Sequence, residues 1–328
     1  MSLHDLIRDR RIKRIITHPE DDNAVWRADL ERFISGDTTL TRRSAGESAI
    51  RAIQRLLIFL GYSTSSSGAF AIDGDFGRGT NRGVAQFLVE DGRSRSIDRK
   101  TLCYPCRWNT ARTLITAIPD VRLTPATLEK MAHVAIERCE AKQIMTGRFD
   151  DAIFHLNALD KRQYLNCRDI LARYGDMAKA ASDTLLDETG KLVRAEWILA
   201  IIRQETAGVI RPRFEQHYIT RLNREHPAVD LAELRMQSMS MGLGQVMGAN
   251  YKRVGGASAT ELFTAPAARQ VEFVARFLRS KADVVAKANP SERDFRELAR
   301  YYNGPKYEAH HYHERLARWH REFKMLMA

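Results

Sequence analysis

The stretch ILAIIRQETAGVIRPRFEQHY, residues 198–218, places an acidic side chain directly after an apolar run. Residues 198–202 are all apolar, and this run predicts a buried helix that continues to Glu205. A carboxylate at the end of a buried helix is in a setting that raises its pKa, so that it can hold a proton near neutral pH. A second acid, Glu215, follows ten residues later. Taken alone, Glu205 is better explained as an exposed glutamate on an amphipathic helix, because such residues are common.

The composition is typical of a globular protein with an ample core. The 328 residues are 44% hydrophobic and 28% charged, and this length predicts two or three domains. The net charge of +11 is uneven, since residues 191–328 carry 23 Lys and Arg against 15 Asp and Glu, whereas residues 1–190 carry 29 against 26. Basic surfaces attract nucleic acids, anionic membranes or acidic polymers. No helix-turn-helix, zinc or aromatic-strand signature is present in the sequence, so no nucleic-acid partner is predicted.

The sequence contains no segment typical of a membrane span or an export signal. No apolar run approaches the roughly 18 residues that cross a bilayer. Residues 1–16 have charges scattered through them instead of a continuous apolar stretch. We therefore expect synthesis in the host cytoplasm without a signal peptide, so that action on a substrate outside would require release.

The four cysteines predict neither a metal site nor a cofactor. Cys103 and Cys106 form a Cys-x-x-Cys pair, which occurs in zinc and redox sites. A zinc site needs a second closely spaced pair, whereas Cys139 and Cys167 are single and far apart. We interpret the cysteines as reduced structural residues, and we expect no metal and no cofactor.

Residues 1–40 are expected to form a charged lead-in with one helix. Trp26, Leu30 and Phe33 have the spacing of a small apolar stripe on that helix. The histidine and proline at positions 18 and 19 are expected to form a turn before it.

The next segment is predicted to contain helices joined by a glycine-rich turn. Ser48 is expected to cap the first helix, which ends at Gly61, and Thr80 is expected to cap the second. Between them, residues 72–77 read IDGDFG, a tight turn that uses glycine where φ is positive. This order of features resembles the peptidoglycan-binding domain found beside many cell-wall hydrolases. The resemblance implies a small three-helix module over residues 41–118.

The following segment is expected to be helical throughout. Thr124 followed by Pro125 is a typical helix start. No alternating strand pattern of any length is present, so the fold class is predicted to be mainly all-α. Glycines 175 and 190 are interpreted as breaks, and the helices are predicted over residues 126–142, 150–159, 162–174 and 177–186.

Two further motifs lie downstream of Glu205. Residues 237–248 read QSMSMGLGQVMG, in which the glycines let the backbone approach a ligand closely and Gln245 offers an amide to a sugar substituent. Residues 300–307 read RYYNGPKY, where tyrosine and asparagine precede a Gly-Pro break and could stack on and bond to a sugar ring. Each motif alone is also explained by core packing or by a helix end.

Together, these motifs follow an order that is similar to that of the goose-type lysozyme and lytic transglycosylase superfamily. Their particular form, Arg-Phe-Glu-x-His-Tyr, Ser-x-Gly-Leu-Gly-Gln-Val-Met-Gly and Tyr-Asn-Gly-Pro-x-Tyr, resembles the N-acetylmuramidase family of phage endolysins. The resemblance covers residues 191–327 and implies a lysozyme-like helical catalytic domain over residues 119–328. A peptidoglycan-binding module ahead of such a domain is a familiar endolysin arrangement.

The resemblance also implies roles for individual residues. Glu205 matches the catalytic glutamate that gives a proton to the leaving glycosidic oxygen, and Glu215 could activate water as a base. Thr206 stands where the family usually has serine, and keeps the hydroxyl. The other expected substrate-binding residues are Phe214 and His217 of the Phe-Glu-x-His motif, Ser240 and Gln245 of the glycine-rich motif, and Tyr302 and Asn303.

The expected partner is bacterial peptidoglycan. We expect the protein to be a monomer that acts in the periplasm or on the cell wall after its release. Attack by water would hydrolyse the bond between N-acetylmuramic acid and N-acetylglucosamine. Attack by an oxygen of the muramic acid itself would give an anhydro product, as in lytic transglycosylases. A protein that only binds the wall and has no activity is a third alternative.

Residues 311–327 are predicted to form a basic amphipathic helix. Its apolar stripe runs from Tyr312 to Leu326, with arginines and a lysine around it. We expect this helix to close the catalytic domain, and a sharper hypothesis is contact with anionic outer-membrane lipid. The histidines between His310 and His313 are interpreted as surface residues, because no partnered acid stands at metal-ligand spacing.

Overall fold

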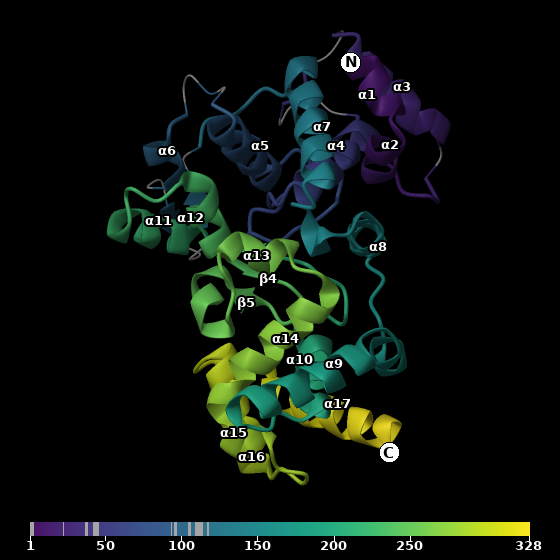
Figure 1. Ribbon diagram of the computed structural model, residues 1–328. Helices are drawn as coiled ribbons and strands as arrows, with labels where there is room; N and C mark the ends of the chain where they lie inside the picture. The colour runs from purple at the N-terminus through teal and green to yellow at the C-terminus, as the bar shows by residue number, and fades with distance from the viewer. Residues whose placement is uncertain are drawn as a thin grey trace. The chain divides into compact units, whose positions relative to one another are not determined.

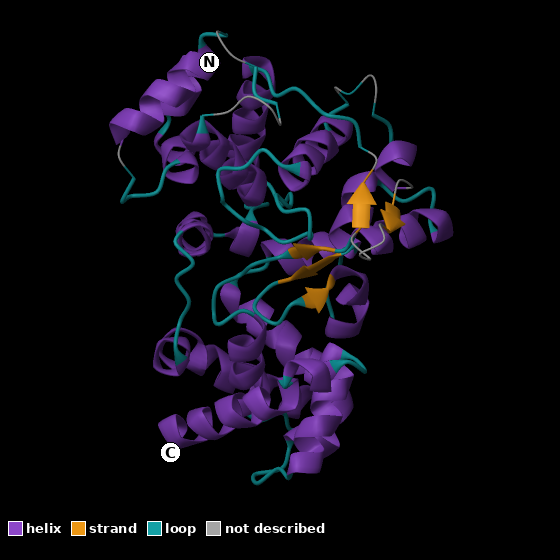
Figure 2. Cartoon of the chain, turned by 180° about the vertical axis from the view of Figure 1, so that it is seen from behind, coloured by secondary structure: helices purple, strands orange, loops and turns teal. Residues whose placement is uncertain are grey.

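The computed structural model describes residues 3–21, 23–36, 39–41, 46–92, 94, 97–103, 106–108, 114–116 and 118–328. The chain is mainly helical, as predicted, and its strands are short (Figures 1 and 2). By packing it divides into two compact units. The first unit comprises Met1–Gln163 and Arg211–Ser240, and the second comprises Tyr164–Ile210 and Met241–Ala328. These units are defined by packing and the predicted domains by motifs, so the predicted domain ranges stay predictions.

Helices also make up most of the first unit. Short strands β1 (Cys106–Trp108) and β2 (Leu114–Thr116) pair antiparallel. Strand β3 (Arg213–Phe214) pairs antiparallel with β4 (Met239–Met241), so that Arg213 lies opposite Ser240. The helices are α1 (Leu3–Arg8), α2 (Arg10–Ile16), α3 (Asn23–Ile34), α4 (Glu47–Phe59), α5 (Arg78–Glu90), α6 (Arg99–Cys103), α7 (Pro125–Glu140), α8 (Phe149–Asp160), α11 (Gln216–Glu225) and α12 (Leu231–Gln237).

The amino-terminal segment contains three helices, so the prediction of a single helix there is wrong. Helices α1 and α2 bury Leu6, Ile12 and Ile15. Asp9 caps α2, because its side chain accepts hydrogen bonds from two backbone N–H groups of the first turn. These apolar residues have helical spacing, but the many charged residues between them make that pattern hard to detect in the sequence. Helix α3 confirms the predicted helix, although the side chain of Trp26 lies outside the described residues.

The predicted helix caps at Ser48 and Thr80 are wrong. Helix α4 begins one residue before Ser48, with Gly46 as its cap, and α5 begins two residues before Thr80, with Gly77 as its cap. The Thr80 hydroxyl is instead buried and donates to backbone oxygens of the loop that precedes α5. By contrast, Thr124 caps α7 with proline at the first helical position, as predicted.

The glycine-rich turn is held in place by Gln54 of α4. The Gln54 amide oxygen accepts hydrogen bonds of 2.9 Å from the backbone N–H groups of Asp73 and Gly74. Its amide nitrogen donates to Asp73 Oδ1 at 2.7 Å. Gly74 has φ +74°, which confirms the predicted positive φ in this turn. The order of glutamine, Asp-Gly and threonine in the sequence is therefore explained by the hydrogen bonds that hold this loop.

Residues 211–240 leave the second unit and pack on the first. The Phe214 N–H donates to the carbonyl oxygen of Gly68 at 2.8 Å, and a side chain at position 68 would overlap Phe214. The Arg235 guanidinium donates to the Glu90 carboxylate at 2.7 Å, and both side chains are buried. The Gln216 amide donates to the carbonyl oxygen of Leu102 at 2.8 Å. Residues 211–240, called the excursion below, are therefore anchored by Gly68, Glu90 and Leu102. All three belong to the segment that resembles a peptidoglycan-binding domain.

The core of the second unit is built around α10 (Ala195–Glu205). Its residues Trp197 to Ile202 are fully buried, and each such aliphatic side chain contributes about 1.5–3 kcal/mol to stability. Helix α10 packs against α9, α14 and α17. The elements of this unit are α9 (Cys167–Thr189), α10, β5 (Val246–Met247), α13 (Ala259–Thr264), α14 (Ala267–Leu278), α15 (Ala282–Val285), α16 (Glu292–Asn303) and α17 (Tyr312–Met327).

Helix α9 runs unbroken through Gly175, so the predicted break at this residue is wrong. A single glycine costs a helix only about 1 kcal/mol relative to alanine. A capping box of Asn166 and Asp169 begins α9, and Gly190 ends it with φ +66°, as predicted. Tertiary packing of Tyr174, whose hydroxyl donates to the Gly208 carbonyl oxygen at 2.9 Å, outweighs the local cost of the glycine.

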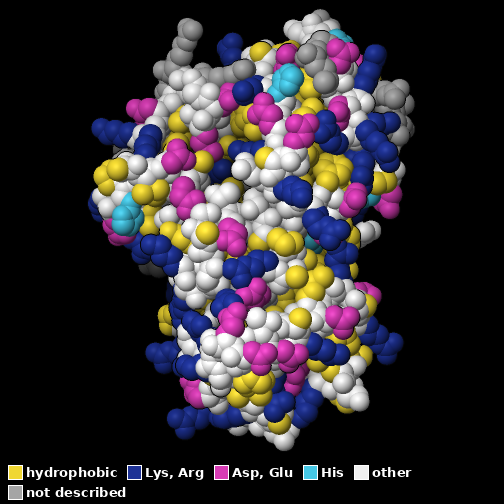
Figure 3. All heavy atoms as spheres, viewed as in Figure 1, with side chains coloured by type: hydrophobic (Ala, Val, Ile, Leu, Met, Phe, Trp, Pro, Cys, Tyr) yellow, Lys and Arg dark blue, Asp and Glu magenta, His cyan; other side chains and the backbone are white. Residues whose placement is uncertain are grey.

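Among the described residues, the helices are all too short or too polar to traverse a lipid bilayer. Lys and Arg side chains alternate with Asp and Glu side chains over the face that Figure 3 shows.

Candidate active site

The carboxylate of Glu205 stands at the end of a buried helix, as the sequence predicts. Glu205 is the last residue of α10, and Thr206 is its C-terminal cap. The Glu205 side chain is half-buried, whereas the five residues from Ile198 to Ile202 are fully buried. The apolar run therefore fixes the helix in the core and brings the carboxylate to the edge of that core.

Two tyrosines lie beside this carboxylate. The Tyr312 hydroxyl, at the start of α17, donates a short hydrogen bond to Glu205 Oε1. Burial, together with the negative charge of Glu205, raises the pKa of Tyr312 and of Tyr302 well above the usual tyrosine value. Both hydroxyls therefore stay protonated and remain donors. The structure thus assembles one carboxylate and two phenols from α10, α16 and α17.

The Gly-Leu-Gly-Gln loop is held against the end of α10. The Thr206 hydroxyl donates to the carbonyl oxygen of Leu243 at 2.8 Å. The Leu243 N–H donates to Gln270 of α14 at 3.2 Å, and the Tyr302 hydroxyl donates to the Gly244 carbonyl oxygen at 2.6 Å. A side chain at position 244 would meet both Val274 and Tyr302, so only glycine fits there.

Gln245 follows this loop in an unusual backbone conformation. Its φ is +50°, in the left-handed region that non-glycine residues seldom occupy. The side chain is half-buried, and its amide nitrogen donates to the Gly242 carbonyl oxygen at 3.2 Å. Such backbone strain is often found at functional sites, and the role predicted for Gln245 stays a prediction.

Thr206 lies in the core at the C-terminal end of α10, and its predicted contact with substrate stays a prediction. Its side chain is fully buried, and its hydroxyl donates to the carbonyl oxygens of Ile202 and Leu243. Thr206 thus fastens the glycine loop to the end of α10. Asn303, in contrast, is exposed at the last residue of α16, before Gly304 takes φ +84°.

The Phe-Glu-x-His motif belongs to the first unit. Phe214 is buried, and the Arg82 guanidinium lies 5.1 Å from the centre of its ring. Glu215 Oε1 pairs with Arg213 Nε at 2.9 Å, and Glu215 Oε2 lies 3.7 Å from His217 Nδ1. His217 is exposed. The side chains of Glu215 and His217 are therefore near neighbours, whereas Phe214 holds the segment on the core.

Ser240 and Glu215 are both tied to the β3–β4 pair. Ser240 lies opposite Arg213 in the ladder, and it is half-buried. The Glu215 N–H donates to the Ser238 carbonyl oxygen at 2.8 Å. The structure thus groups Phe214, Glu215, His217 and Ser240 in one unit, and Glu205, Thr206, Gln245, Tyr302 and Asn303 in the other.

Tyr312 is the residue of this site that the sequence argument missed. Its place in the apolar stripe of α17 indicated a core residue, and Tyr312 is indeed buried. Only its hydroxyl reveals the second role, because a buried tyrosine needs a hydrogen-bond partner. The interpretation of all the nearby histidines as surface residues is also wrong, since His313 is buried, whereas His310 and His311 are exposed.

The described residues contain no group of three or more His, Cys, Asp and Glu side chains that could hold a metal ion. Cys103 is buried, and the side chain of Cys106 lies outside the described residues, so the interpretation of this pair stays a prediction. Burial raises the pKa of both Cys139 and Cys167 to about 11, and these two thiols therefore stay protonated at neutral pH.

Comparisons with known proteins find one family model that matches the part of the chain around Glu205. A search of curated proteins finds no match to the chain. Among solved structures, the crystal structure of a Burkholderia AP3 phage endolysin is similar at 17% identity and a TM-score of 0.34, over 89% of this chain and 100% of that one. Residues 204–324 match the family model Muramidase, described as N-acetylmuramidase. The matched residues include Glu205, the glycine loop and both tyrosines.

Proposed function

We propose that the chain is a modular peptidoglycan hydrolase that cleaves the β-1,4 bond between N-acetylmuramic acid and N-acetylglucosamine, with Glu205 as the general acid. The observation that carries this proposal is the Glu205 carboxylate at the end of buried α10, held by the Tyr312 hydroxyl within the family domain. A carboxyl group at the edge of a core, fixed by one donor, suits proton transfer to a leaving oxygen.

In the proposed first step, Glu205 gives its proton to the glycosidic oxygen while the bond to the muramic acid carbon breaks. Positive charge develops on that carbon, and the ionised Glu205 left behind stabilises it. Tyr312 then donates its hydrogen bond to a full carboxylate, so this bond becomes stronger as the proton leaves. Gln245, Tyr302 and Asn303 are proposed to bind the sugars.

In the proposed second step, water attacks the same carbon and Glu215 accepts the proton of that water. The Glu215 carboxylate forms an ion pair with Arg213. The other candidate is attack by the 6-hydroxyl oxygen of the muramic acid, which would close an anhydro ring without consuming water. This alternative is the lytic transglycosylase reaction.

The decisive experiment is digestion of purified peptidoglycan followed by mass spectrometry of the released muropeptides. Reducing-end muramic acid is the expected product, and anhydro-muramic acid would replace the hydrolase by a transglycosylase. Substitution Glu205→Gln should lower the rate by roughly 100-fold or more, because a general acid contributes about that much. Glu196→Gln, in the first turn of the same helix, is the matched control and should keep the rate. Undiminished clearance of wall fragments by Glu205→Gln would exclude Glu205 as the general acid, whereas a parent protein that releases no muropeptides would be a non-catalytic wall-binding protein.

We further propose that the enzyme acts as a phage-type endolysin, as a monomer on the cell wall after release from the host cytoplasm, without a nucleic-acid partner. The family of the domain at 204–324 supports this setting. Fractionation of producing cells tests it, since the protein should be soluble in the cytoplasm until lysis begins.

We also propose that α17 contacts anionic outer-membrane lipid through its positive charges and not through its apolar face. The apolar face of α17 packs on α10, whereas Arg315, Arg318 and Arg321 are exposed. Replacing these three arginines by glutamine should leave the cleavage of purified wall unchanged and reduce the permeabilisation of intact cells. Equal permeabilisation by both proteins would exclude this contact.

A further inference from the structure

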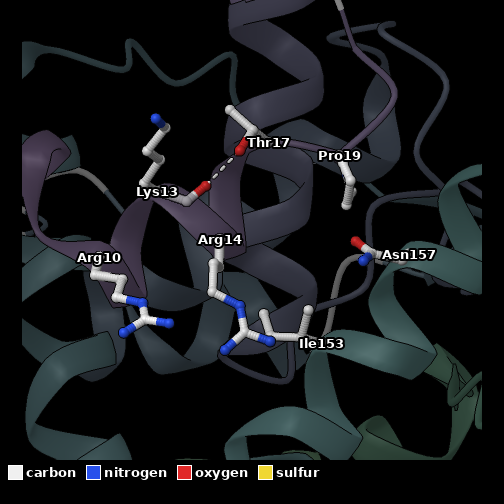
Figure 4. Close-up of a pocket in the computed structure, with 7 residues that line it drawn as sticks. All are labelled: Arg10, Lys13, Arg14, Thr17, Pro19, Ile153 and Asn157. Atoms are coloured by element: carbon white, nitrogen blue, oxygen red, sulfur yellow. Dashed lines mark hydrogen bonds between the residues drawn. The ribbon is translucent and has the colours of Figure 1, made fainter.

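A basic pocket lies between α2 and α8 of the first unit, away from every residue assigned above. Its volume is about 370 Å³, and its walls come from α2, the turn that follows α2, and α8 (Figure 4). Residues of both helices lie outside residues 41–118, which resemble a peptidoglycan-binding domain.

Three cations of α2 line one side of the pocket. Arg10, Lys13 and Arg14 are spaced at three and four residues, so they lie on one face of the helix, and all three are exposed. Arg14 forms an ion pair of 2.8 Å with Asp150. Arg10 and Lys13 have no ion-pair partner among the described residues. Three positive charges against one negative charge leave a net charge of +2 at this site.

Asn157 of α8 adds an uncharged donor that is fixed in orientation. Its amide oxygen accepts a hydrogen bond of 2.7 Å from the guanidinium of Arg55. Arg55 is itself buried, and it also donates to Asp160 Oδ2 at 2.6 Å and to the Thr17 carbonyl oxygen at 2.8 Å. Because the amide oxygen is engaged by this buried cation, the Asn157 amide nitrogen is the group left to face the pocket, into which the side chain points (Figure 4).

The remaining wall is apolar or already satisfied. Ile153 and Pro19 provide carbon surface. The Thr17 hydroxyl donates a hydrogen bond to the carbonyl oxygen of Lys13 at 2.6 Å. The pocket therefore offers two guanidinium groups, one ammonium group and one amide as donors, together with the carbon surface of Ile153 and Pro19.

We propose that this pocket binds a phosphate monoester attached to a small organic group. A phosphate monoester carries about −1.5 to −2 charges near neutral pH, which matches the net +2 of the site. Its oxygens accept hydrogen bonds from guanidinium groups in a forked geometry. Ile153 and Pro19 give the carbon chain of the attached organic group a surface to contact, and inorganic phosphate lacks such a chain. Such a site would hold the protein on a phosphate-bearing component of the cell envelope, independently of the chemistry of Glu205.

Titration calorimetry on the full-length chain tests the proposal with inorganic phosphate and with glycerol 1-phosphate. Glycerol 1-phosphate should bind, and more tightly than inorganic phosphate. The triple variant R10Q/K13Q/R14Q should bind it at least tenfold more weakly, because charged hydrogen bonds contribute that much each. The matched control K100Q/R122Q/K142Q removes the same charge from exposed positions of the first unit outside the pocket, and it should bind as the parent does.

Asn157→Asp is the sharper variant, because it is nearly isosteric. An aspartate still accepts the hydrogen bond from Arg55, so the fold is kept, but it replaces the donor that faces the pocket by a second acceptor. Binding should again fall at least tenfold while the thermal midpoint stays at or above that of the parent. Unchanged binding in both pocket variants, or an equal loss in the control, would overturn the proposal.

Vesicles of phosphatidylcholine, with and without phosphatidic acid, distinguish the source of the phosphate. Co-sedimentation with phosphatidic acid vesicles that is lost in R10Q/K13Q/R14Q supports the site and identifies a lipid headgroup. Binding of glycerol 1-phosphate without vesicle binding supports the site and identifies a soluble or sugar phosphate. Vesicle binding without any binding of the soluble phosphates contradicts it, because the attraction would then be a general one.

Discussion

At the scale of single residues, the hydroxyl of Tyr312 completes the environment of Glu205. The two residues are 107 positions apart in the chain, so no local spacing could reveal their contact. The apolar run before Glu205 does predict where the carboxylate stands, because helical periodicity is a local property. The position of the Glu205 carboxylate could therefore be predicted from the sequence, and its contact with Tyr312 could not.

Tyr312→Phe tests this partnership with the least disturbance of packing. We expect a fall in kcat of about tenfold to a hundredfold, because a hydrogen bond to a charged group is worth about 1.5–3 kcal/mol. Initial rates on purified wall measure the effect, and unchanged thermal unfolding shows that the fold is kept. The matched control is Tyr307→Phe, whose hydroxyl bonds to an exposed glutamate. A Tyr312→Phe enzyme with the parental rate would remove Tyr312 from the mechanism.

His320 makes the second unit sensitive to acid. Its ring is buried 4.3 Å from that of Trp197, and this burial lowers its pKa from 6.5 to about 4. The folded state thus favours the neutral ring, so stability is lost as pH falls from about 6.5 to about 4, up to roughly 3 kcal/mol. Urea unfolding at pH 7 and at pH 4.5 should show this loss, and His320→Leu should reduce it. An equal loss in His320→Leu would assign the effect to other groups.

At the scale of elements, the buried pair of Glu90 and Arg235 joins α5 to α12. Tyr62 donates to Glu90 Oε2 at 2.7 Å, and its ring lies 4.2 Å below the Arg235 guanidinium. Burial beside Glu90 raises the pKa of Tyr62, so its hydroxyl stays protonated. Arg235 also donates to the Gly61 carbonyl oxygen at 2.5 Å. These contacts satisfy the donors of a guanidinium that is almost fully buried.

Glu90→Gln should destabilise the first unit by about 3–5 kcal/mol, because it leaves the buried Arg235 charge uncompensated. Urea unfolding monitored by tryptophan fluorescence measures the change. The control Glu137→Gln alters an exposed helical glutamate of the same unit and should cost far less. A Glu90→Gln protein as stable as the parent would show that this pair contributes specificity instead of stability.

The elements themselves were predictable where local signals act alone. Thr124 with Pro125 marks a helix start, and Gly74 marks a turn, because each signal depends on the backbone of that residue. The predictions of Ser48 and Thr80 as caps are wrong, because Gly46 and Gly77 cap those helices and the Thr80 hydroxyl donates to the loop before α5. The break expected at Gly175 failed because tertiary packing outweighs a small propensity cost.

At the scale of the whole molecule, residues 211–240 make the predicted catalytic domain depend on the other predicted domain for its stability. A fragment of residues 119–328 would contain this excursion without Gly68, Glu90 and Leu102, which hold it. We expect the fragment to aggregate or to lose cleavage of purified wall, even though it contains the whole family domain. Circular dichroism melting and a turbidity assay test this, with the full-length chain as control. A fragment that melts cooperatively and cleaves at the parental rate would contradict the expectation.

The order in which the chain visits its two units also has a consequence for its synthesis. The first unit is interrupted after Gln163 and is complete only at Ser240, after residues 164–210 of the second unit have been made. Domains usually fold one after another as a chain leaves the ribosome. Here Glu90 is synthesised about 145 residues before its partner Arg235, so their ion pair cannot form until Arg235 has left the ribosome. Helices α9 and α10 of the second unit emerge between the two. The anchored excursion therefore predicts that the two units mature together, late in translation, instead of in sequence.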